Sequence, residues 1–537
     1  MVEWHNELIT ERLYWFGSGV VPTERDCVGF QLDAGIVSVH LLSPMLKRLI
    51  SFVALVCLAG TLSAAPKQPN ILWIIVDDMS AQFSSYGETL IETPNVDRLA
   101  REGTKFTKAF VTAPVCSTCR SAFITGMYQT SIGAQHHRSG RGEKKIRLPE
   151  GVRPVPELFK EAGYYTSVGG WPNRKGRLGK TDYNFEWDEK MYDGNDWSGR
   201  KKGQPFFAQI QTPGGKLRGG TTEACEAFAQ RMEKTLGSRT KPEDVHLAPY
   251  YPRDPVLLHD WAAYLDSVRE TDRVVGEILA RLKKEGDLEN TLVIFMTDHG
   301  ISHARGKQFM YEEGLRVPLV VAGPGIAKGK VRKDLVEHID IAAISLAAAG
   351  IKIPETMEAR DVFAKDYQPR EAVFAARDRC DETVEHLRSV RTGRYKYIRN
   401  FLHQRPMLQP NAYKDHKSIY IALRKANKEG KLSAMQKKLL FAPTRPKEEL
   451  YDLLHDPFEL NNLAAAAAHK ATLEDLRGRL DKWIVDTGDK GNAPEPVAMF
   501  DSDMKVYLDT LKIRRPDRLP EIEGNIALMK KWAAEGK

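Results

Sequence analysis

Short apolar runs alternate with helical patterns between residue 70 and about residue 350. Residues 70–76 (NILWIIV) are nearly all apolar and rich in β-branched side chains, which is typical of a strand buried on both faces. Residues 254–284 carry the apolar spacing of a long amphipathic helix. Shorter helices are expected at 93–100 and 156–162, and further strands at 164–168, 205–211, 291–296 and 317–322. This alternation predicts an α/β domain whose sheet is covered by helices on both faces.

The pattern changes after about residue 385. Residues 388–398 read as a hairpin with its turn at Thr392-Gly393, and 449–453 as a short strand. Amphipathic helices follow, one of them at 470–486. We therefore expect a large α/β domain over residues 66–385 and a smaller α+β domain over residues 386–537.

The N-terminal region has the pattern of an export signal. Residues 45–65 combine a basic start, an apolar run and a small-residue end, which is typical of a cleaved signal peptide. The apolar run is too short for a stable membrane span. Because a signal peptide begins at the start codon, we interpret residues 1–44 as a mis-annotated extension. The sequence thus predicts an exported protein, periplasmic or extracellular.

Charge and cysteine content narrow the class of protein. The formal net charge is +8, and the basic residues are scattered along the chain. This favours an anionic substrate and argues against nucleic acid, which is bound by a dense basic stripe. Four cysteines follow residue 65, too few for a disulfide framework in a chain of this size.

Polar residues follow two of the predicted strands directly. Asp77 and Asp78 come after the strand at 70–76, and Asp298 and His299 come after the strand at 291–296. Ligands in open α/β sheets bind beyond the carboxyl ends of strands, and a divalent cation relieves the repulsion between adjacent carboxylates. An ordinary acidic loop is the alternative for either pair alone. The two pairs together predict a metal centre.

A third pattern surrounds Cys116, in the segment VCSTCRSAFITG. The CxxC spacing of Cys116 and Cys119 also fits a zinc half-site or a redox pair, but no second ligand-spaced cluster accompanies it. The segment resembles the signature of the formylglycine-dependent sulfatases, C-x-P/A-x-R followed by an apolar helix ending in Thr-Gly, with Cys116 and Arg120 in register. The resemblance extends to Asp77-Asp78, to Asp298-His299-Gly300 and to Lys307. It also includes the segment 311–318 and the Glu-Leu-Tyr-Asp-Leu and Asp-Pro patterns at 449–457.

The resemblance implies an alkaline-phosphatase-like fold, a large sandwich with a mixed central sheet flanked by helices, plus a smaller α+β C-terminal domain. It implies that Cys116 is oxidised to formylglycine and hydrated to a diol, one hydroxyl of which attacks sulfur. The metal, Ca2+ with Mg2+ as the alternative, would be held by residues that match the family's ligand positions: Asp77, Asp78, Cys116, Asp298 and His299. The catalytic positions that match are Cys116, Arg120, Lys180, His303 as proton donor, and Lys307.

Several positions depart from the family pattern. Thr118 replaces the usual proline or alanine, which puts efficient conversion of Cys116 in question, and Cys119 replaces a small residue and offers a disulfide partner to an unconverted Cys116. Asp182 stands where the G-K-x-H motif has its histidine. A further family histidine has no match, and Lys216 is the nearest residue. The substrate side is assigned to His136, His137 and Lys216.

The chain resembles bacterial heparan N-sulfatases and arylsulfatases among these enzymes, which implies hydrolysis of sulfate esters or sulfamates on a heparan-like or other sulfated saccharide. It implies a partner that matures Cys116, either a formylglycine-generating enzyme or an anaerobic sulfatase-maturing enzyme. Two alternatives stay open at this point. One is a phosphodiesterase or phosphonate monoester hydrolase of the same superfamily, and the other is a non-catalytic glycan-binding homologue.

Overall fold

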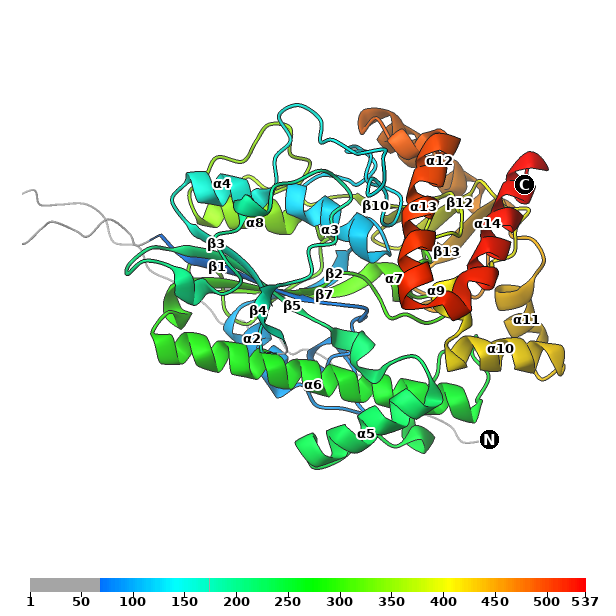
Figure 1. Ribbon diagram of the computed structural model, residues 1–537, viewed down its shortest axis with the longest axis horizontal. Helices are drawn as coiled ribbons and strands as arrows, with labels where there is room; N and C mark the ends of the chain where they lie inside the picture. The colour runs from blue at the N-terminus through cyan, green and yellow to red at the C-terminus, as the bar shows by residue number, and fades with distance from the viewer. Residues whose placement is uncertain (1–67, 173) are drawn as a thin grey trace, which may run out of the picture. The chain divides into compact units, whose positions relative to one another are not determined.

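The computed structural model describes residues 68–172 and 174–537 (Figure 1). The predicted extension at 1–44 and the predicted signal peptide at 45–65 lie outside the described residues. Among the described residues, no helix has both the length and the apolar character needed to cross a membrane. The described residues form one compact unit.

A mixed sheet of nine strands forms the centre of this unit. The strand order is β4-β3-β5-β1-β6-β7-β2-β8, and β9 pairs with β2. The strand β1 lies in the middle and is parallel to both of its neighbours, β5 and β6, whereas β7 is antiparallel to β6. The strands are β1 (Asn70–Val76), β2 (Thr104–Phe110), β3 (Tyr165–Gly170), β4 (Arg174–Leu178), β5 (Phe206–Thr212), β6 (Thr291–Thr297), β7 (Arg316–Ala322), β8 (Lys330–Arg332) and β9 (Val336–Glu337).

Helices cover both faces of this sheet, as the sequence predicts (Figure 1). Three of them lie on one face: α3 (Cys116–Thr125), α4 (Val155–Glu161) and α8 (Asp340–Ala348). The other face carries α2 (Pro94–Glu102) and the long α6 (Pro255–Glu285), and α5 (Thr222–Leu236) packs against the outer side of α6. Both faces of β1 are therefore buried, since none of its seven residues is exposed to solvent, which explains its nearly uninterrupted apolar sequence.

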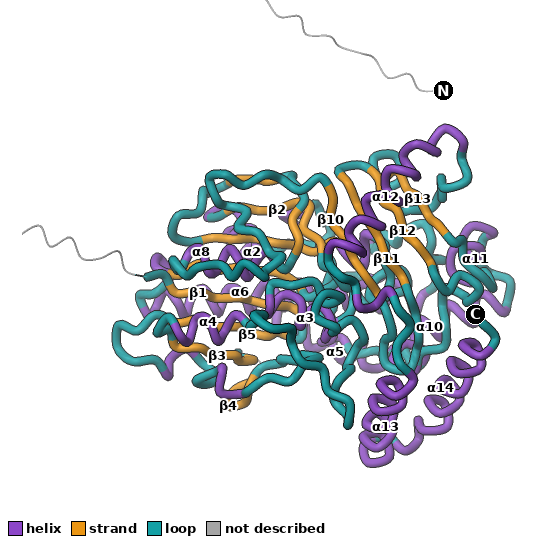
Figure 2. Tube along the Cα trace, turned by 90° about the horizontal axis from the view of Figure 1, so that it is seen from above, coloured by secondary structure: helices purple, strands orange, loops and turns teal. Residues whose placement is uncertain are grey.

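A second, antiparallel sheet of four strands lies in the C-terminal part of the chain (Figure 2). Its strands are β10 (Ala372–Arg377), β11 (Leu387–Thr392), β12 (Tyr395–Asn400) and β13 (Glu448–Asp452). The helices of this part are α9 (Ala412–Asp415), α10 (Ser418–Lys428), α11 (Ala434–Phe441), α12 (Lys470–Asp486), α13 (Val497–Arg514) and α14 (Leu519–Ala534). The α+β character matches the prediction, and β10 begins ahead of the expected boundary at 385/386.

The main structural feature that the sequence analysis missed is the edge of the large sheet beyond β7. The strand β2 (TKFTKAF) is only partly buried, and its register against β7 shifts between Phe106 and Ala109. Its lysines and threonines and this bulge remove the continuous apolar run by which the other strands are detected. The strands β8 and β9, which pair with β2, have only three and two residues.

Candidate active site

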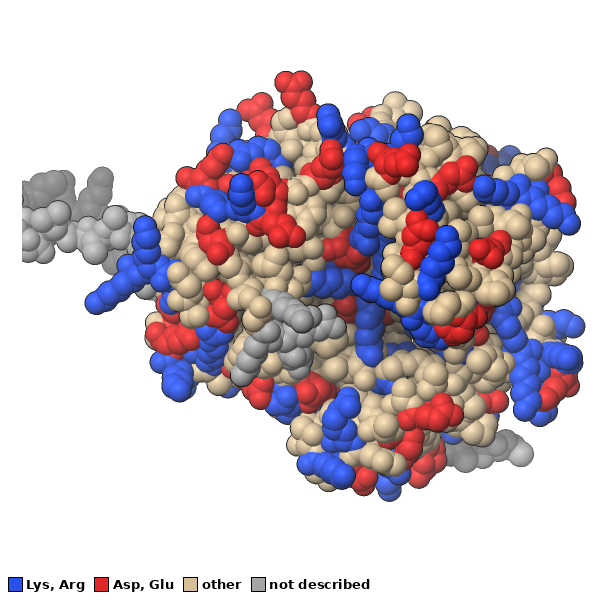
Figure 3. Space-filling view, in the orientation of Figure 1, with Lys and Arg blue, Asp and Glu red and all other residues tan. Residues whose placement is uncertain are grey.

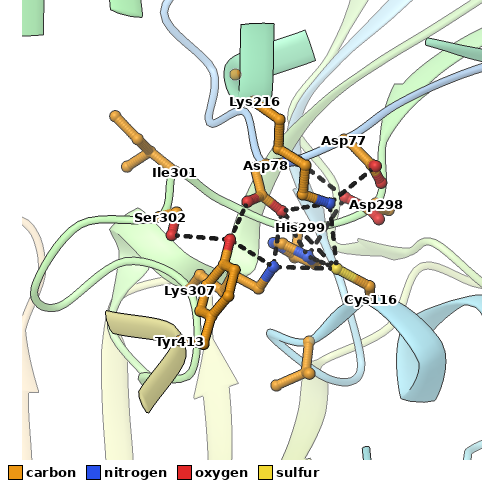
Figure 4. Close-up of polar contacts among 12 residues, drawn as sticks. Asp77, Asp78, Cys116, Lys216, Asp298, His299, Ile301, Ser302, Lys307 and Tyr413 are labelled. Carbon is orange, nitrogen blue, oxygen red and sulfur yellow. Dashed lines mark hydrogen bonds and ion pairs between the residues drawn. The ribbon is translucent and has the colours of Figure 1, made fainter. Parts of the chain in front are cut away.

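The carboxyl ends of β1 and β6 bring four predicted metal ligands together (Figure 4). Asp77 and Asp78 follow β1, and Asp298 and His299 follow β6. The backbone N–H of Asp78 donates to Asp298 Oδ1 at 3.1 Å. His299 Nε2 lies 3.3 Å from Asp78 Oδ1 and 3.4 Å from Asp298 Oδ1. The adjacency of the two strands is therefore the direct cause of this cluster.

Cys116 is the first residue of α3 and points into the same cluster (Figure 4). Its Sγ lies 3.0 Å from His299 Nε2 and 3.1 Å from Lys307 Nζ. Lys216 Nζ is 3.7 Å away and Asp78 Oδ1 3.8 Å away. A potential nucleophile thus lies beside both acidic ligands and ammonium groups.

Lys216 reaches the cluster because a glycine pair lets its loop approach β1. The short 3-10 helix η4 (Gly214–Arg218) follows β5, and the N–H of Gly215 donates to the carbonyl oxygen of Asp77 at 2.9 Å. A Cβ atom at Gly214 would lie 2.3 Å from that oxygen, and one at Gly215 would lie 2.1 Å from the carbonyl oxygen of Asp78. Only glycine permits this approach. Lys216 Nζ then lies 2.8 Å from Asp77 Oδ2.

Arg120 lies one turn after Cys116 in α3 and is completely enclosed in the site. Its Nη2 donates to Asp77 Oδ1 at 2.6 Å and to Asp298 Oδ2 at 3.0 Å. A third contact joins Nη1 to the side-chain oxygen of Gln211, a residue that the sequence analysis did not identify. Arg120 therefore ties α3 to the ends of β1, β5 and β6, which fixes the position of Cys116.

The positive charges determine the ionisation of the site. Burial alone would raise the pKa of Asp77, but Lys180, Lys216 and Arg120 outweigh it and hold that pKa well below its usual value. Burial likewise opposes ionisation of Cys116, and the surrounding lysines still hold the pKa of its thiol well below the usual value. Burial raises the pKa of Asp298 to about 7. The geometry therefore favours negative charge at residue 116 and at the β1 carboxylates.

The donor set fits a divalent cation. His299 Nδ1 lies 2.9 Å from the carbonyl oxygen of Gly300 and must donate to it, so in the neutral ring the lone pair is on Nε2. That lone pair faces two carboxylate oxygens, an arrangement that a bound cation would make favourable. The site contains two groups of three potential ligand atoms, and within each group the atoms lie within 4.8 Å of one another. One group is Asp78, Cys116 and His299, and the other is Asp77, Cys116 and Asp298.

A cavity of about 590 Å3 opens the cluster to solvent on the lysine side. Asp77, Lys180, Gln211 and Lys216 are among its lining residues. The side chain of Lys180 is 27% exposed and that of Lys216 31% exposed, whereas Lys307 is buried. A ligand that enters this cavity meets two ammonium groups before it reaches Cys116, which suits an anionic group.

Tyr413 belongs to the cluster although no motif in the sequence marks it (Figure 4). It lies in α9, more than a hundred residues after Lys307. Its hydroxyl donates to Asp78 Oδ2 at 3.0 Å and lies 3.5 Å from Lys307 Nζ. Lys417 Nζ is 4.3 Å from the centre of its ring. The C-terminal part of the chain thus completes the site.

We expect Tyr413→Phe to lower kcat by about ten- to a hundredfold with little change in thermal stability. The substitution removes only the hydroxyl, and a hydrogen bond to a charged group contributes about 1.5–3 kcal/mol. Steady-state kinetics and thermal unfolding of the same preparation would test this. The equivalent change at the more distant Tyr420 is the control, and equal losses in the two variants would contradict the role given to Tyr413.

Three predicted site residues, His303, His136 and His137, lie away from the cluster. His303 does not reach Cys116, because its Nε2 contacts Asp260 and its ring stacks on Trp261 at 4.8 Å. Burial lowers the pKa of His303 to about 4. The resemblance implies that His303 is the proton donor, but in this placement its ring contacts Asp260 and Trp261 and not Cys116.

The histidine pair lies on the other side of α3. His137 Nδ1 is 2.7 Å from Ser117 Oγ, next to the nucleophile position, and its Nε2 is 3.8 Å from Asp381 Oδ1. His136 packs further out, with Nε2 3.9 Å from Glu495. Of the three predicted substrate residues, only Lys216 contacts Cys116. Lys180, one of the predicted catalytic residues, contacts Asp77 at 3.0 Å.

Comparison with known families agrees with this geometry. Residues 69–351 match the sulfatase family, and residues 299–439 match the C-terminal region of N-sulphoglucosamine sulphohydrolase. An ulvan-active sulfatase of Formosa agariphila is 32% identical over 472 residues, which is 80% of this chain and 77% of that protein. Human N-sulphoglucosamine sulphohydrolase is 27% identical over 81% of this chain and 93% of its own length.

Solved structures share the fold. A complex of BT4656 with D-glucosamine-2-N,6-O-disulfate superposes with a TM-score of 0.56 at 18% identity, over 80% of this chain and 100% of that one. The phosphonate monoester hydrolase of Agrobacterium radiobacter gives a TM-score of 0.53 at 18% identity, over 78% and 96%. These likenesses concern the fold. The family matches, together with a cysteine, an arginine and carboxylates assembled at two strand ends, show that this chain belongs to the sulfatase family and is a sulfuric ester hydrolase.

Proposed function

We propose that this sulfatase hydrolyses the sulfate ester or sulfamate bonds of a sulfated glycan. The reaction would use a nucleophile made from Cys116 and the help of a divalent cation. The observation that carries the proposal is the position of Cys116 Sγ, within 3.8 Å of His299, Lys307, Lys216 and Asp78. The names of its relatives, an ulvan-active sulfatase and N-sulphoglucosamine sulphohydrolase, support a glycan as substrate.

The nucleophile in this proposal is formylglycine at position 116. Conversion requires an oxidising maturation enzyme as a partner, of either the formylglycine-generating or the anaerobic sulfatase-maturing class. Once hydrated, the aldehyde would offer one hydroxyl to attack sulfur and expel the alcohol or amine of the glycan. Loss of the proton of the second hydroxyl would then re-form the aldehyde and release the sulfate. Lys307, buried 3.1 Å from the thiol, and Arg120, one turn along α3, hold that side chain in place.

The cation is proposed as Ca2+, with Mg2+ as the alternative. Asp77, Asp78 and Asp298 would supply hard carboxylate oxygens, which both ions prefer, and His299 Nε2 would complete the set. When bound, such an ion neutralises charge on the sulfuryl oxygens and lowers the pKa of the attacking hydroxyl. Three carboxylates against one imidazole argue for Ca2+ over Zn2+.

Lys180 and Lys216 are the residues proposed to bind the sulfuryl oxygens. Both side chains line the open cavity and both ammonium groups lie within 3.0 Å of Asp77. Interaction with Asp77 and Asp78 raises the pKa of Lys216 well above its usual value, although burial opposes this, so its charge is permanent at neutral pH. Fixed charges stabilise a developing anion without reorganising, which is usually the largest single contribution to catalysis.

Parallel assays would test the reaction class. Purified protein, co-expressed with a maturation enzyme, is expected to release sulfate from an aryl sulfate or from ulvan or heparan oligosaccharides, at a far higher kcat/KM than it shows with an aryl phosphonate monoester. A higher kcat/KM with the phosphonate would favour the hydrolase alternative represented by the Agrobacterium fold relative. Absence of turnover with every substrate, in protein whose residue 116 is an aldehyde, would favour a binding protein.

We also propose that the protein is exported. The support is the signal-peptide pattern at residues 45–65. N-terminal sequencing of protein recovered from the periplasm or the medium is expected to find a chain that begins close to residue 66. A mature chain that retains residues 1–44 would refute both the cleavage and the interpretation of that extension.

A further inference from the structure

A second hollow lies beside the reaction centre. Its volume is about 580 Å3, and Arg141, Lys145, Asp182, Glu186 and Trp187 are among its lining residues. Lys180 lines the first cavity, while the next two residues, Thr181 and Asp182, line the second, so one short segment faces both spaces. Figure 3 shows lysine and arginine side chains lining a hollow in the middle of one face, with acidic side chains among them. This second space is within the size range of ligand pockets.

Asp182 links the second cavity to the reaction centre through Lys180. Its Oδ2 is 3.7 Å from Lys180 Nζ, and Lys180 in turn contacts Asp77 in the reaction centre. Its Oδ1 accepts a hydrogen bond from Arg141 Nη2 at 2.5 Å. Only 9% of this side chain is exposed, and Oδ2 accepts no hydrogen bond from the described residues. A buried carboxylate oxygen without a donor is uncommon, and a ligand hydroxyl would satisfy it.

The charges around Asp182 keep this acceptor ionised. Burial alone would raise the pKa of Asp182, but Lys180, Arg141 and Arg138 outweigh it and lower that pKa. Arg141 is 36% exposed, so the part of its guanidinium that does not contact Asp182 remains available to a ligand. The pair therefore offers an acceptor and several donors side by side.

Trp187 supplies an apolar wall to the same hollow. It is partly exposed, and two other rings restrain it edge-on. The centroid of the Tyr183 ring lies 5.4 Å from that of Trp187, and the centroid of the Tyr192 ring lies 6.3 Å away. A restrained aromatic ring offers contact area at a small cost in conformational entropy. An aromatic face beside a carboxylate and a guanidinium suits a ligand that has apolar C–H faces and a hydroxyl-bearing edge, as a sugar ring does.

We propose that Arg141, Asp182 and Trp187 form a saccharide subsite that binds the sugar next to the one whose sulfate is cleaved. Asp182 accepts a hydroxyl hydrogen bond, Arg141 donates to ring substituents, and Trp187 packs against the ring face. The inference rests on the proposed function for the identity of the glycan. The residue that replaces the histidine of the related motif thus serves recognition of a neighbouring sugar.

The test compares a sulfated monosaccharide with a tetrasaccharide that carries the same sulfate. In Trp187→Ala and in Arg141→Gln, the ratio of kcat/KM for the tetrasaccharide to kcat/KM for the monosaccharide is expected to fall about tenfold, mainly through KM. The matched controls are Trp532→Ala, a partly exposed tryptophan on α14, and Arg479→Gln, whose side chain is 35% exposed on α12. Their ratios are expected to stay within about twofold of the wild-type ratio. An unchanged ratio in both test variants would overturn the subsite.

A binding measurement separates this proposal from the proposed function. Calorimetry with an unsulfated tetrasaccharide and the Cys116→Ala protein is expected to show binding that Trp187→Ala weakens about tenfold. If wild-type protein releases no sulfate but this binding depends on Trp187, the proposed function fails and the subsite remains. If sulfate release is normal and Trp187→Ala changes neither the ratio nor the binding, the subsite fails and the function remains.

Discussion

Cys116→Ala is expected to abolish sulfate release, with kcat/KM reduced by at least about a thousandfold, because alanine offers neither a thiol for oxidation nor a hydroxyl for attack. The neighbouring hydroxyl of Ser117 cannot replace the nucleophile at residue 116, because it points toward His137. Sulfate release from an oligosaccharide, together with mass spectrometry of the peptide that contains residue 116, would measure both parts of the prediction. The wild-type peptide is expected to carry an aldehyde after maturation.

Cys119→Ala is the matched control within the same helix. Its thiol donates to the carbonyl oxygen of Asp298, and burial raises its pKa well above the usual value, so it remains a neutral thiol. We therefore expect the variant to keep most of the activity, with a loss of no more than about threefold that reflects a small cavity. Equal damage from the two substitutions would show that the assignment of the two cysteines is wrong.

Asp298→Asn is expected to give the second largest effect, with kcat/KM reduced by at least about a hundredfold and with weaker metal binding. The substituted amide would keep the shape of the side chain but remove the acidic group whose ionised form Arg120 contacts at 3.0 Å and a bound cation would stabilise. Breaking a buried ion pair costs about 3–5 kcal/mol, so the melting temperature is also expected to fall. Ca2+ at a hundred times its Kd stabilises a protein by about 2.7 kcal/mol, and this gain is expected to disappear in the variant.

Asp272→Asn distinguishes loss of the metal site from general destabilisation. Asp272 is another buried carboxylate, but it accepts hydrogen bonds from the backbone N–H groups of Asn95 and Val96, at the start of α2. We expect this control to lower the melting temperature while the stabilisation by Ca2+ remains. A normal Ca2+ effect in Asp298→Asn would remove Asp298 from the proposed ligand set.

These two predictions concern different parts of one arrangement. In the proposed mechanism residue 116 would provide the reacting atom, and Asp298 would hold both Arg120, which positions α3, and the cation. If the catalytic losses occur without any effect of Asp298→Asn on Ca2+ dependence, the carboxylate acts only by orienting Arg120. If Asp298→Asn loses both its activity and its dependence on Ca2+, the charge of Asp298 also serves to bind the metal.

Much of the site was predictable because its chemistry is local in the sequence. Buried parallel strands read as uninterrupted apolar runs, so the ends of β1 and β6 are located within a residue or two. Asp77, Asp78, Asp298 and His299 follow these ends directly and therefore lie at one edge of the sheet. Arg120 lies on the same face of α3 as Cys116, because four residues make about one helical turn.

The tertiary structure alone decided which distant side chains join the predicted residues of the site. Lys216 enters because two glycines let η4 approach the backbone just after β1. Tyr413 enters because α9 packs against the loop after β6, where Lys414 Nζ donates to the carbonyl oxygen of Lys307. His303 is excluded since that loop folds back, with the N–H of Lys307 donating to the carbonyl oxygen of Ile301 at 2.7 Å. Sequence periodicity specifies the direction of a side chain only within a helix or strand, whereas its direction in a loop depends on packing against distant segments.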